Sequence, residues 1–458
     1  MTHPHFAPAR AAAFVIALGG FMSNDAEPAR AAADPGPPPV ERIVAAALAD
    51  SSAFALLADL CDTAGSRLNG SEGQRRAVAW ALDRLRAGGL DGVRAEPVTV
   101  PHWVRGRETC TLLEPYEQPL TMLGLGGSVG TPPGGIAAEV LAVRDFDELE
   151  ARAAEAAGRL VLFDPPWEGY GKTVQYRGRG AVAAARHGAV GCLIRSVTDR
   201  SLATPHTGIM RYDKGDTIPR IPAAALSVED TALLTRLSRR GETVRVRLEM
   251  GATQLPDAPT ANVVADLPGR ELPDEYVVAG AHLDSWDVGS GAHDDGAGCA
   301  IVMEAVMLLK RLDLAPRRTL RVVLFADEEM TQQGGRGYAR DHADELPRHR
   351  AALECDSGGY APAGFTVQAD SATVARFAAL AAPLAPLGAD AVTPGGGGVD
   401  ISFLAEAGVP LIGHRVHGEH YFDVHHSPAD TVEKVDPADL QRNVAAVAAL
   451  LWAIAEAP

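Results

Sequence analysis

The residues with the clearest chemistry lie in a glycine-rich loop that follows a short apolar run. His282, Asp284 and Asp294 lie in this loop, and the run before it, at 276–281, is typical of a buried strand. Loops at the carboxyl ends of strands are where open α/β sheets bind ligands. Imidazole and carboxylate groups are the ligands that zinc uses when no cysteine is at hand. The loop therefore predicts a catalytic metal site, whose remaining ligands must come from elsewhere in the chain.

Three later apolar runs also lead into acidic or histidine residues. The runs and residues are 320–325 with Glu328 and Glu329, 351–354 with Asp356, and 410–412 with His425 and His426. Because parallel strands end at one edge of a sheet, we expect these side chains to meet in one cleft. So many carboxylates would raise each other's pKa unless cations neutralised them. Two zinc ions about 3.5–4 Å apart, the usual spacing of two-metal sites, would provide that charge.

Alternating strand and helix patterns after residue 259 predict the frame that positions these loops. Helices are expected at 299–312, 337–343, 373–380, 400–407 and 437–455, and earlier in the chain at 40–60 and 73–87. The alternation predicts an α/β fold with a largely parallel, mixed central sheet and helices on both faces.

A change of texture between residues 105 and 258 predicts an inserted domain. This segment has recurrent turn pairs and short β-like runs, with one expected helix at 181–187, so we expect it to be β-rich. A chain of 458 residues is also too long for one ordinary core. The predicted division is a signal peptide (1–33), a first part of the metal-binding domain (34–104), the inserted domain (105–258) and a second part of the metal-binding domain (259–458).

The N-terminal residues predict export. An apolar run at 11–22 follows Arg10 and precedes small residues at 29–33, a pattern that is typical of a signal peptide. The run is too short to cross a bilayer. We therefore expect a secreted or periplasmic protein without a membrane span.

Composition limits the classes of binding partner and the roles that the cysteines can have. The net charge of −17 argues against a nucleic-acid partner, which would need a basic surface. The five cysteines are odd in number and stand singly along the chain. They predict neither a Cys-x-x-Cys zinc motif nor a fully paired set of disulfides.

Taken together, the spaced motifs resemble those of the di-zinc exopeptidase family of secreted bacterial aminopeptidases, most closely its carboxypeptidase Q branch. The segments that carry the resemblance are 65–71, 282–289, 291–298, 328–329, 354–356, 398–401, 407–410 and 425–431. Several motifs in the family's order are far more specific than any one of them. The resemblance extends over essentially the whole chain after the signal peptide, because residues 105–258 look like a protease-associated domain.

The resemblance implies a metal-binding role for five residues and two zinc ions per chain. His282 and Asp356 would hold one zinc ion, and Glu329 and His426 would hold the other. Asp294 would bridge the two ions, and the peptide bond that follows it would be cis.

Catalytic roles are implied for three more residues. Glu328 would be the general base, taking a proton from the attacking water and passing it to the leaving amine. Asp284 would orient His282, because a metal-bound imidazole usually has a hydrogen-bonding partner. His425 would either stabilise the oxyanion of the tetrahedral intermediate or be an imidazole without catalytic contact, and the sequence leaves both roles open.

Neighbouring residues have simpler interpretations. Asp287 and Asp295 are expected to be loop and turn residues, and His293 to have a structural or substrate-side role. Trp286 either lines the pocket or packs in the interior. The letters Gly-x-Ser-x-Gly at 126–130 match a nucleophile elbow by chance, because a proline-rich turn follows them instead of a helix.

These residues predict a secreted or periplasmic zinc-dependent exopeptidase that hydrolyses short peptides, above all dipeptides, with water activated by two zinc ions. Three alternatives stay open: an aminopeptidase that acts on longer peptides, a single-zinc transferase of the glutaminyl-cyclase type, and an inactive binding protein with a peptidase fold. The resemblance suggests a homodimer as well. The preferred side chains of the substrate cannot be read from the sequence.

Overall fold

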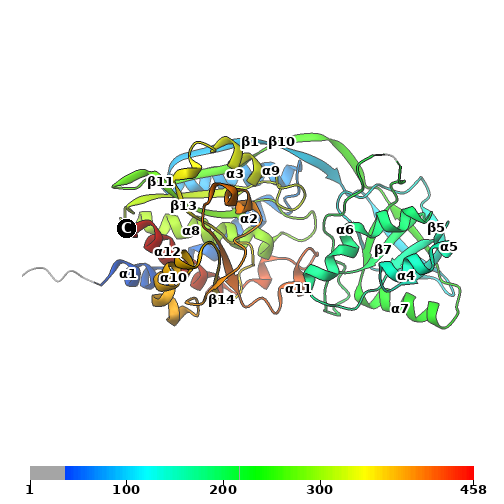
Figure 1. Cartoon of the computed structure of the whole chain (residues 1–458). Coiled ribbons are helices and arrows are strands. Elements are labelled where there is room, and N and C mark those ends of the chain that lie inside the picture. The colour runs from blue at the N-terminus through cyan, green and yellow to red at the C-terminus, as the bar shows by residue number, and fades with distance from the viewer. Residues whose placement is uncertain (1–36, 216) are drawn as a thin grey trace, which may run out of the picture. The chain divides into compact units, whose positions relative to one another are not determined.

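The computed structural model describes residues 37–215 and 217–458, and these residues form two eight-stranded sheets (Figure 1). The first sheet has the order β1 (Asp91–Val104), β10 (Thr253–Leu267), β12 (Arg318–Phe325), β11 (Leu272–His282), β13 (His349–Glu354), β16 (Leu411–Val416), β14 (Pro362–Gln368) and β15 (Val392–Pro394). The central strands β12, β11, β13 and β16 are parallel, whereas β10 and β14 run antiparallel to their central neighbours. The mixed sheet of an α/β fold, predicted from the sequence, is confirmed.

Strand β11 lies in the middle of this sheet and is buried on both faces. Val277 and Ala279 pack into the hydrophobic cluster on one face, and Val278 packs into the cluster on the other, as the two-residue period of a strand requires. One face is covered by α1 (Pro39–Leu48), α2 (Ser52–Ala64), α3 (Glu72–Ala87), α8 (Ala297–Arg311), α10 (Ser371–Ala381) and α12 (Pro437–Glu456), and the other by α9 (Gln333–Asp341) and the 3-10 helix η4 (Asp400–Ala407).

Local differences from the predicted elements have local causes. The single helix expected at 40–60 is two helices, because the Asp50 carboxylate accepts hydrogen bonds from the backbone N–H groups of Ser51 and Ser52 and ends the first one. Residues 400–407 form a 3-10 helix and not an α-helix. Strands β14 and β15 are not predicted, since proline and glycine interrupt their short apolar pattern.

Residues 105–252, which lie between the end of β1 and the start of β10, are called the inserted segment below. They contain the whole second sheet, in the order β3 (Gln118–Leu120), β2 (Glu108–Glu114), β9 (Arg245–Met250), β5 (Ile136–Val143), β6 (Leu160–Phe163), β7 (Gly191–Arg195), β8 (Ala223–Leu226) and β4 (Met122–Gly124). Strands β5 to β8 are parallel, with helices α4 (Phe146–Ala151), α5 (Ala153–Ala156), α6 (Tyr170–Arg186) and α7 (Val228–Arg239) among them.

This arrangement differs from the predicted β-rich domain, because the inserted segment is itself of mixed α/β type. Helix α6 begins at Tyr170, eleven residues before the helix expected at 181–187, and its first two-thirds contain three glycines that dilute the apolar pattern. Helix α7 was not expected at all, although Ser227 caps it by accepting a hydrogen bond from the backbone N–H of Asp230. Separate hydrophobic clusters cover the two faces of the second sheet.

Strands β1 and β10, which flank the inserted segment in the chain, pair with each other. Their antiparallel ladder runs from the Asp91–Asp266 pair to the Val104–Thr253 pair. Figure 1 shows the two strands as one ribbon that continues the edge of the first sheet. The chain therefore leaves and re-enters the first sheet through neighbouring strands.

Two sequence predictions concern membranes and export. Among the described residues, no single helix has the length and apolar composition needed to cross a membrane. Helices α1 and α2 meet this length and composition only when taken together, and they are bent by 55° relative to each other. The signal peptide predicted at 1–33 lies outside the described residues.

Candidate metal centre

The carboxyl ends of β11, β12 and β13 and the segment after β16 meet at one pocket of about 360 Å³. Six of the eight predicted site residues line it: Asp294, Glu328, Glu329, Asp356, His425 and His426. The other two are buried: His282 is the last residue of β11, and Asp284 lies in the loop that follows it. The structure thus brings all eight residues to one place, as the edge of a parallel sheet allows.

His282 faces two of the carboxylates. Its Nε2 lies 3.2 Å from Oδ1 of Asp294 and 3.6 Å from Oδ1 of Asp356. The ligand atoms of these three residues all lie within 4.8 Å of one another, close enough to hold one metal ion.

His426 faces the other carboxylate oxygen of the same aspartate. Its Nε2 lies 3.2 Å from Oδ2 of Asp294 and 3.1 Å from Oε2 of Glu329. Asp294 therefore turns one oxygen toward each imidazole, which is the arrangement that a bridging carboxylate needs. Asp294 lies in the segment η1 (Ala292–Gly296), where Asp294 and Asp295 have non-helical backbone angles, and the peptide bond between these two residues is cis, as the resemblance implies.

The donor set fits metal ions. Oε1 of Glu329 is buried without a hydrogen-bond partner among the described residues, although an unpaired buried carboxylate oxygen is costly. Two imidazole nitrogens and three carboxylates around it are borderline-hard ligands of the kind that zinc binds. We conclude that these side chains are arranged for cations.

The electrostatics of the metal-free centre agree with this conclusion. Burial lowers the pKa of His282, but hydrogen bonds to Asp294 and Asp356 outweigh it and raise that pKa well above its usual value. Burial also lowers the pKa of His426, yet the Glu329 and Asp294 carboxylates raise it to about 10. Burial raises the pKa of Asp294, whereas hydrogen bonds to the two imidazoles bring it well below the usual range. The carboxylates thus hold positive charge in the pocket, as protons when no metal ion is there.

Glu328 lines the pocket without being placed as a ligand. Burial raises the pKa of its carboxyl group well above the usual value, and the nearby Asp356 and Glu329 carboxylates raise it further. Its backbone N–H donates to Oδ1 of Asp284 at 3.2 Å. A carboxyl group with a raised pKa at the edge of a reaction pocket can accept and return a proton.

Asp284 contacts His282 through its backbone and not through its carboxylate. The backbone carbonyl of Asp284, and not its carboxylate, accepts the hydrogen bond from His282 Nδ1, at 3.1 Å; the nearest carboxylate oxygen is 3.8 Å away. The carboxylate instead accepts from the backbone N–H groups of Glu328 and Glu329, at 3.2 and 3.3 Å. Asp284 therefore fixes the loop that carries the predicted base and a predicted ligand.

His425 lies against His426, with ring centroids 3.6 Å apart and an angle of 19° between the rings. Its Nε2 is 3.8 Å from Oδ2 of Asp294, and its Nδ1 has no hydrogen-bond partner among the described residues. Burial and the neighbouring His426 hold the pKa of His425 well below its usual value. The ring is therefore neutral and beside the pocket, where it can donate an N–H hydrogen bond.

The remaining motif residues have structural contacts. His293 Nδ1 accepts from the backbone N–H of Gly359, and its ring stacks on Tyr360 with centroids 4.2 Å apart. Asp295 accepts from the backbone N–H of His282, and Trp286 is 2 % exposed. Ser128, the central residue of the Gly-x-Ser-x-Gly letters, is 1 % exposed, and its Oγ accepts from the backbone N–H of Ala223. It is not a nucleophile.

Three buried residues that support the centre were missed from the sequence. Arg67 donates to the backbone carbonyls of Leu283, Ser290 and Gly291, and so fixes both ends of the loop at 283–291 that follows β11. Asp430 accepts from the backbone N–H of Asp294 at 3.1 Å, and Asn69 donates to Asp327, next to Glu328. Both Asn69 and Arg67 lie in the motif at 65–71, but their partners are more than 200 residues away in the chain.

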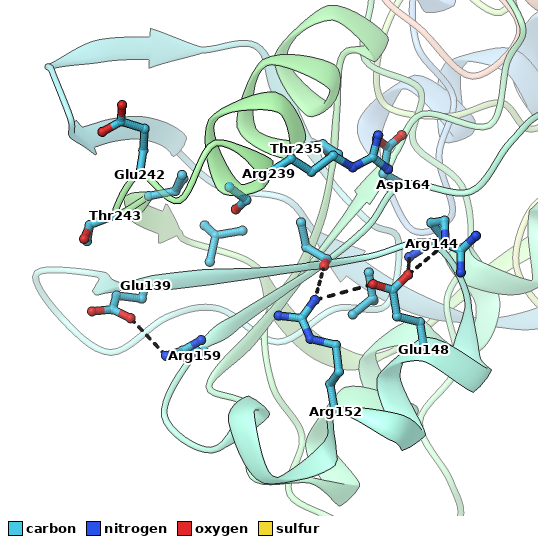
Figure 2. A pocket seen from close by; sticks show the side chains of 15 residues that line it. Glu139, Arg144, Glu148, Arg152, Arg159, Asp164, Thr235, Arg239, Glu242 and Thr243 are labelled. Atoms are coloured by element: carbon cyan, nitrogen blue, oxygen red, sulfur yellow. Dashed lines mark hydrogen bonds and ion pairs between the residues drawn. The ribbon is translucent and has the colours of Figure 1, made fainter.

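The inserted segment also reaches the pocket. Tyr170, Arg177 and Ile209 line it, and the backbone of Thr207 is hydrogen-bonded to His426. A second pocket, of about 340 Å³, lies within the inserted segment (Figure 2). Several of its charged side chains pair with one another, as Arg152 does with Glu148 and Arg159 with Glu139, and its lining contains no histidine or cysteine. That pocket does not offer a metal centre.

The chain is similar to known peptidases over most of its length. The sequence profile described as "Peptidase family M28" matches residues 262–451. Carboxypeptidase Q of Mus musculus is 43% identical over 395 residues, which are 86% of this chain and 83% of the relative. Carboxypeptidase Q of Homo sapiens is 41% identical over 406 residues, which are 89% of this chain and 84% of the relative.

Solved structures show the same fold. A peptidase M28 precursor from Shewanella amazonensis superposes with a TM-score of 0.88 at 38% identity, covering 91% of this chain and 96% of that one. A zinc aminopeptidase from Bacillus subtilis superposes with a TM-score of 0.67 at 20% identity, covering 88% and 95%.

Proposed function

We propose, on the premise that the chain belongs to peptidase family M28 and is a metallo-exopeptidase similar to carboxypeptidase Q, that it hydrolyses dipeptides and other short peptides with two zinc ions. The observation that carries the proposal is the position of Asp294, whose two carboxylate oxygens each lie 3.2 Å from the Nε2 atom of a different imidazole. His282 and Asp356 would hold one ion, and Glu329 and His426 the other.

The chain's own residues would divide the work of peptide hydrolysis. When bound, zinc would polarise the scissile carbonyl and lower the pKa of the attacking water. Glu328 accepts the proton that this water loses as its oxygen attacks the carbonyl carbon. Glu328 then donates the proton to the amine nitrogen as the carbon–nitrogen bond breaks, so that an amine and a carboxylic acid leave, and the acid then loses its proton to the solvent. His425 donates an N–H hydrogen bond to the oxyanion.

The walls of the pocket support a short substrate. Tyr170 and Ile209 come from the inserted segment, and Tyr421, Phe422 and Met330 from the rest of the chain. Its volume of about 360 Å³ lies at the small end of the range for ligand sites. Walls on both sides favour a dipeptide or a similarly short peptide over a long chain passing through.

Elemental analysis and a dipeptide library test the proposal. We expect two zinc ions per chain, loss of hydrolysis on chelation, and recovery when zinc returns. Each hydrolysed dipeptide is then tested with its amino group blocked and with its carboxyl group blocked. The blocked form that is not hydrolysed shows which terminus the enzyme recognises. A chain that turns over no unblocked peptide with both zinc ions bound would refute the proposal. Formation of pyroglutamate from an N-terminal glutamine peptide by a chain with one zinc ion would replace it with a cyclase function.

Three further parts of the proposal concern the setting of the enzyme. The inserted segment is a protease-associated domain, residues 1–33 are a signal peptide that directs export to the periplasm or the medium, and the enzyme is a homodimer. N-terminal sequencing of the exported protein tests the second point, since it should begin near residue 34. Light scattering tests the third, because a mass of one chain would exclude the dimer.

A further inference from the structure

We propose that the inserted segment completes one of the two metal sites, with Thr207 and Arg177 acting as positioning residues for His426. The inference rests on the two-zinc arrangement proposed above. It goes beyond that arrangement because it makes one of the two sites, and only one, depend on a segment that lies outside the first sheet.

The two imidazoles have different hydrogen-bond partners behind them. An imidazole that gives its Nε2 to a metal ion carries its proton on Nδ1, and an acceptor for that proton fixes the plane of the ring. For His282 the acceptor is the carbonyl of Asp284, two residues along the same loop, at 3.1 Å. For His426 the acceptor is the carbonyl of Thr207 in the inserted segment, at 3.3 Å.

Thr207 also holds the backbone of His426. Its N–H donates to the carbonyl of His426 at 2.9 Å, so one residue of the inserted segment contacts both the main chain and the ring. His426 has a φ of +56°, in the left-handed region that a residue with a Cβ rarely adopts. Such a conformation persists where surrounding contacts impose it. The two bonds from Thr207 are contacts of this kind.

Arg177, on helix α6, fixes the carbonyl that His426 uses. Arg177 is 5 % exposed; its Nη1 donates to Thr207 O at 3.3 Å, and its Nη2 donates to the hydroxyl of Tyr170 at 2.9 Å. Nη1 of Arg177 is also 3.3 Å from Nδ1 of His426, so these two nitrogens lie side by side and share the Thr207 carbonyl oxygen as their acceptor. Loss of the guanidinium would release that oxygen and the ring that it orients.

Gly208 allows this close approach. Its φ is +136°, and a Cβ at this position would lie 2.3 Å from Nη1 of Arg177. Any larger residue must displace either the guanidinium or the backbone of Thr207. The position therefore offers a second way to disturb the contact without changing Arg177 itself.

The experiment measures the two zinc affinities separately. Metal-free full-length protein is titrated with zinc against a chromophoric chelator, for the wild type and for Arg177→Met, Arg177→Lys and Gly208→Ala. Arg179→Met is the matched control, because Arg179 is on the same helix but is exposed and pairs with Asp213 at the surface. The melting temperature of each metal-free variant reports whether the fold is intact.

We expect Arg177→Met and Gly208→Ala to weaken one zinc site by about 10–100-fold and to leave the other unchanged, since loss of a partner behind a ligand has effects of this size. Arg177→Lys should recover part of the affinity, because an ammonium group can still donate to the Thr207 carbonyl. Arg179→Met should match the wild type at both sites.

Three results would overturn the inference. The first is that Arg177→Met and Gly208→Ala both bind zinc at both sites with wild-type affinity. The second is that both variants lose zinc affinity equally at the two sites and have a lowered melting temperature, which would mean general destabilisation. If only Arg177→Met is unstable, the zinc affinities of Gly208→Ala and Arg177→Lys test the inference. A wild-type chain that binds a single zinc ion would remove the two-metal function and the inference together, whereas the first two results leave the function in place.

Discussion

Two adjacent glutamates should respond in opposite ways to the same substitution. Glu329 Oε2 lies 3.1 Å from Nε2 of His426, and both residues are proposed ligands, so Glu329→Gln should remove a charged metal ligand. Glu328 lines the pocket with no comparable contact to either imidazole. Glu328→Gln keeps the size of the side chain and removes only its ability to take a proton. We therefore expect the first variant to lose zinc and the second to keep it.

The size of the effect follows from the role of a general base. Such a group contributes about 10²–10⁴-fold to the rate, which corresponds to about 3–5 kcal/mol in the activation free energy. For Glu328→Gln we expect kcat to fall by that factor with two zinc ions per chain and a KM within a few-fold of the wild type. Zinc content, kcat and KM measured on one dipeptide are sufficient. Near-normal kcat with both ions bound, or loss of zinc from this variant, would refute the assignment of Glu328.

Three other predictions concern the centre and its support. The raised pKa values of His282 and His426 favour their protonated forms, so binding of zinc should release protons and zinc affinity should fall as the pH is lowered; calorimetry in buffers of different ionisation enthalpy checks this, and a buffer-independent heat would contradict it. Arg67→Met leaves three buried carbonyls without their charged donor, so the free energy of unfolding should fall by about 3 kcal/mol or more, and a loss below about 1 kcal/mol in urea denaturation would argue against its supporting role. Ser128→Ala should retain wild-type kcat and lose about 1 kcal/mol of stability, whereas a collapse of kcat with intact folding would reopen the nucleophile assignment.

The convergence of the candidate metal ligands could be predicted from the sequence because each follows a recognisable strand, whereas their individual roles are implied only by the resemblance to the exopeptidase family. The apolar runs that became β11, β12 and β13 are buried on both faces, and such strands read as continuous hydrophobic segments. A residue just beyond such a run must lie at the edge of the sheet. The convergence of His282, Glu329 and Asp356 follows from that rule and needs no further knowledge of the structure.

The supporting residues could not be predicted, because they act through backbone atoms that are distant in the chain. Arg67 binds carbonyls more than 200 residues away, and Thr207 contributes only its own N–H and C=O groups to His426. Backbone groups are the same at every position, so no residue type marks them. For the same reason the prediction that Asp284 orients His282 named the residue but not the atom, which is the backbone carbonyl oxygen of Asp284.

The ladder between β1 and β10 has a consequence for the ancestry and the engineering of this enzyme. Val104 and Thr253 face each other as its last pair, so a tight turn between them would close the two strands into a hairpin and omit everything in between. Gain or loss of the inserted segment needs no break in the first sheet. A shortened chain built in this way should keep the hydrophobic core of the first sheet. It should still bind the zinc ion of His282 and Asp356, but it should bind the ion of Glu329 and His426 weakly.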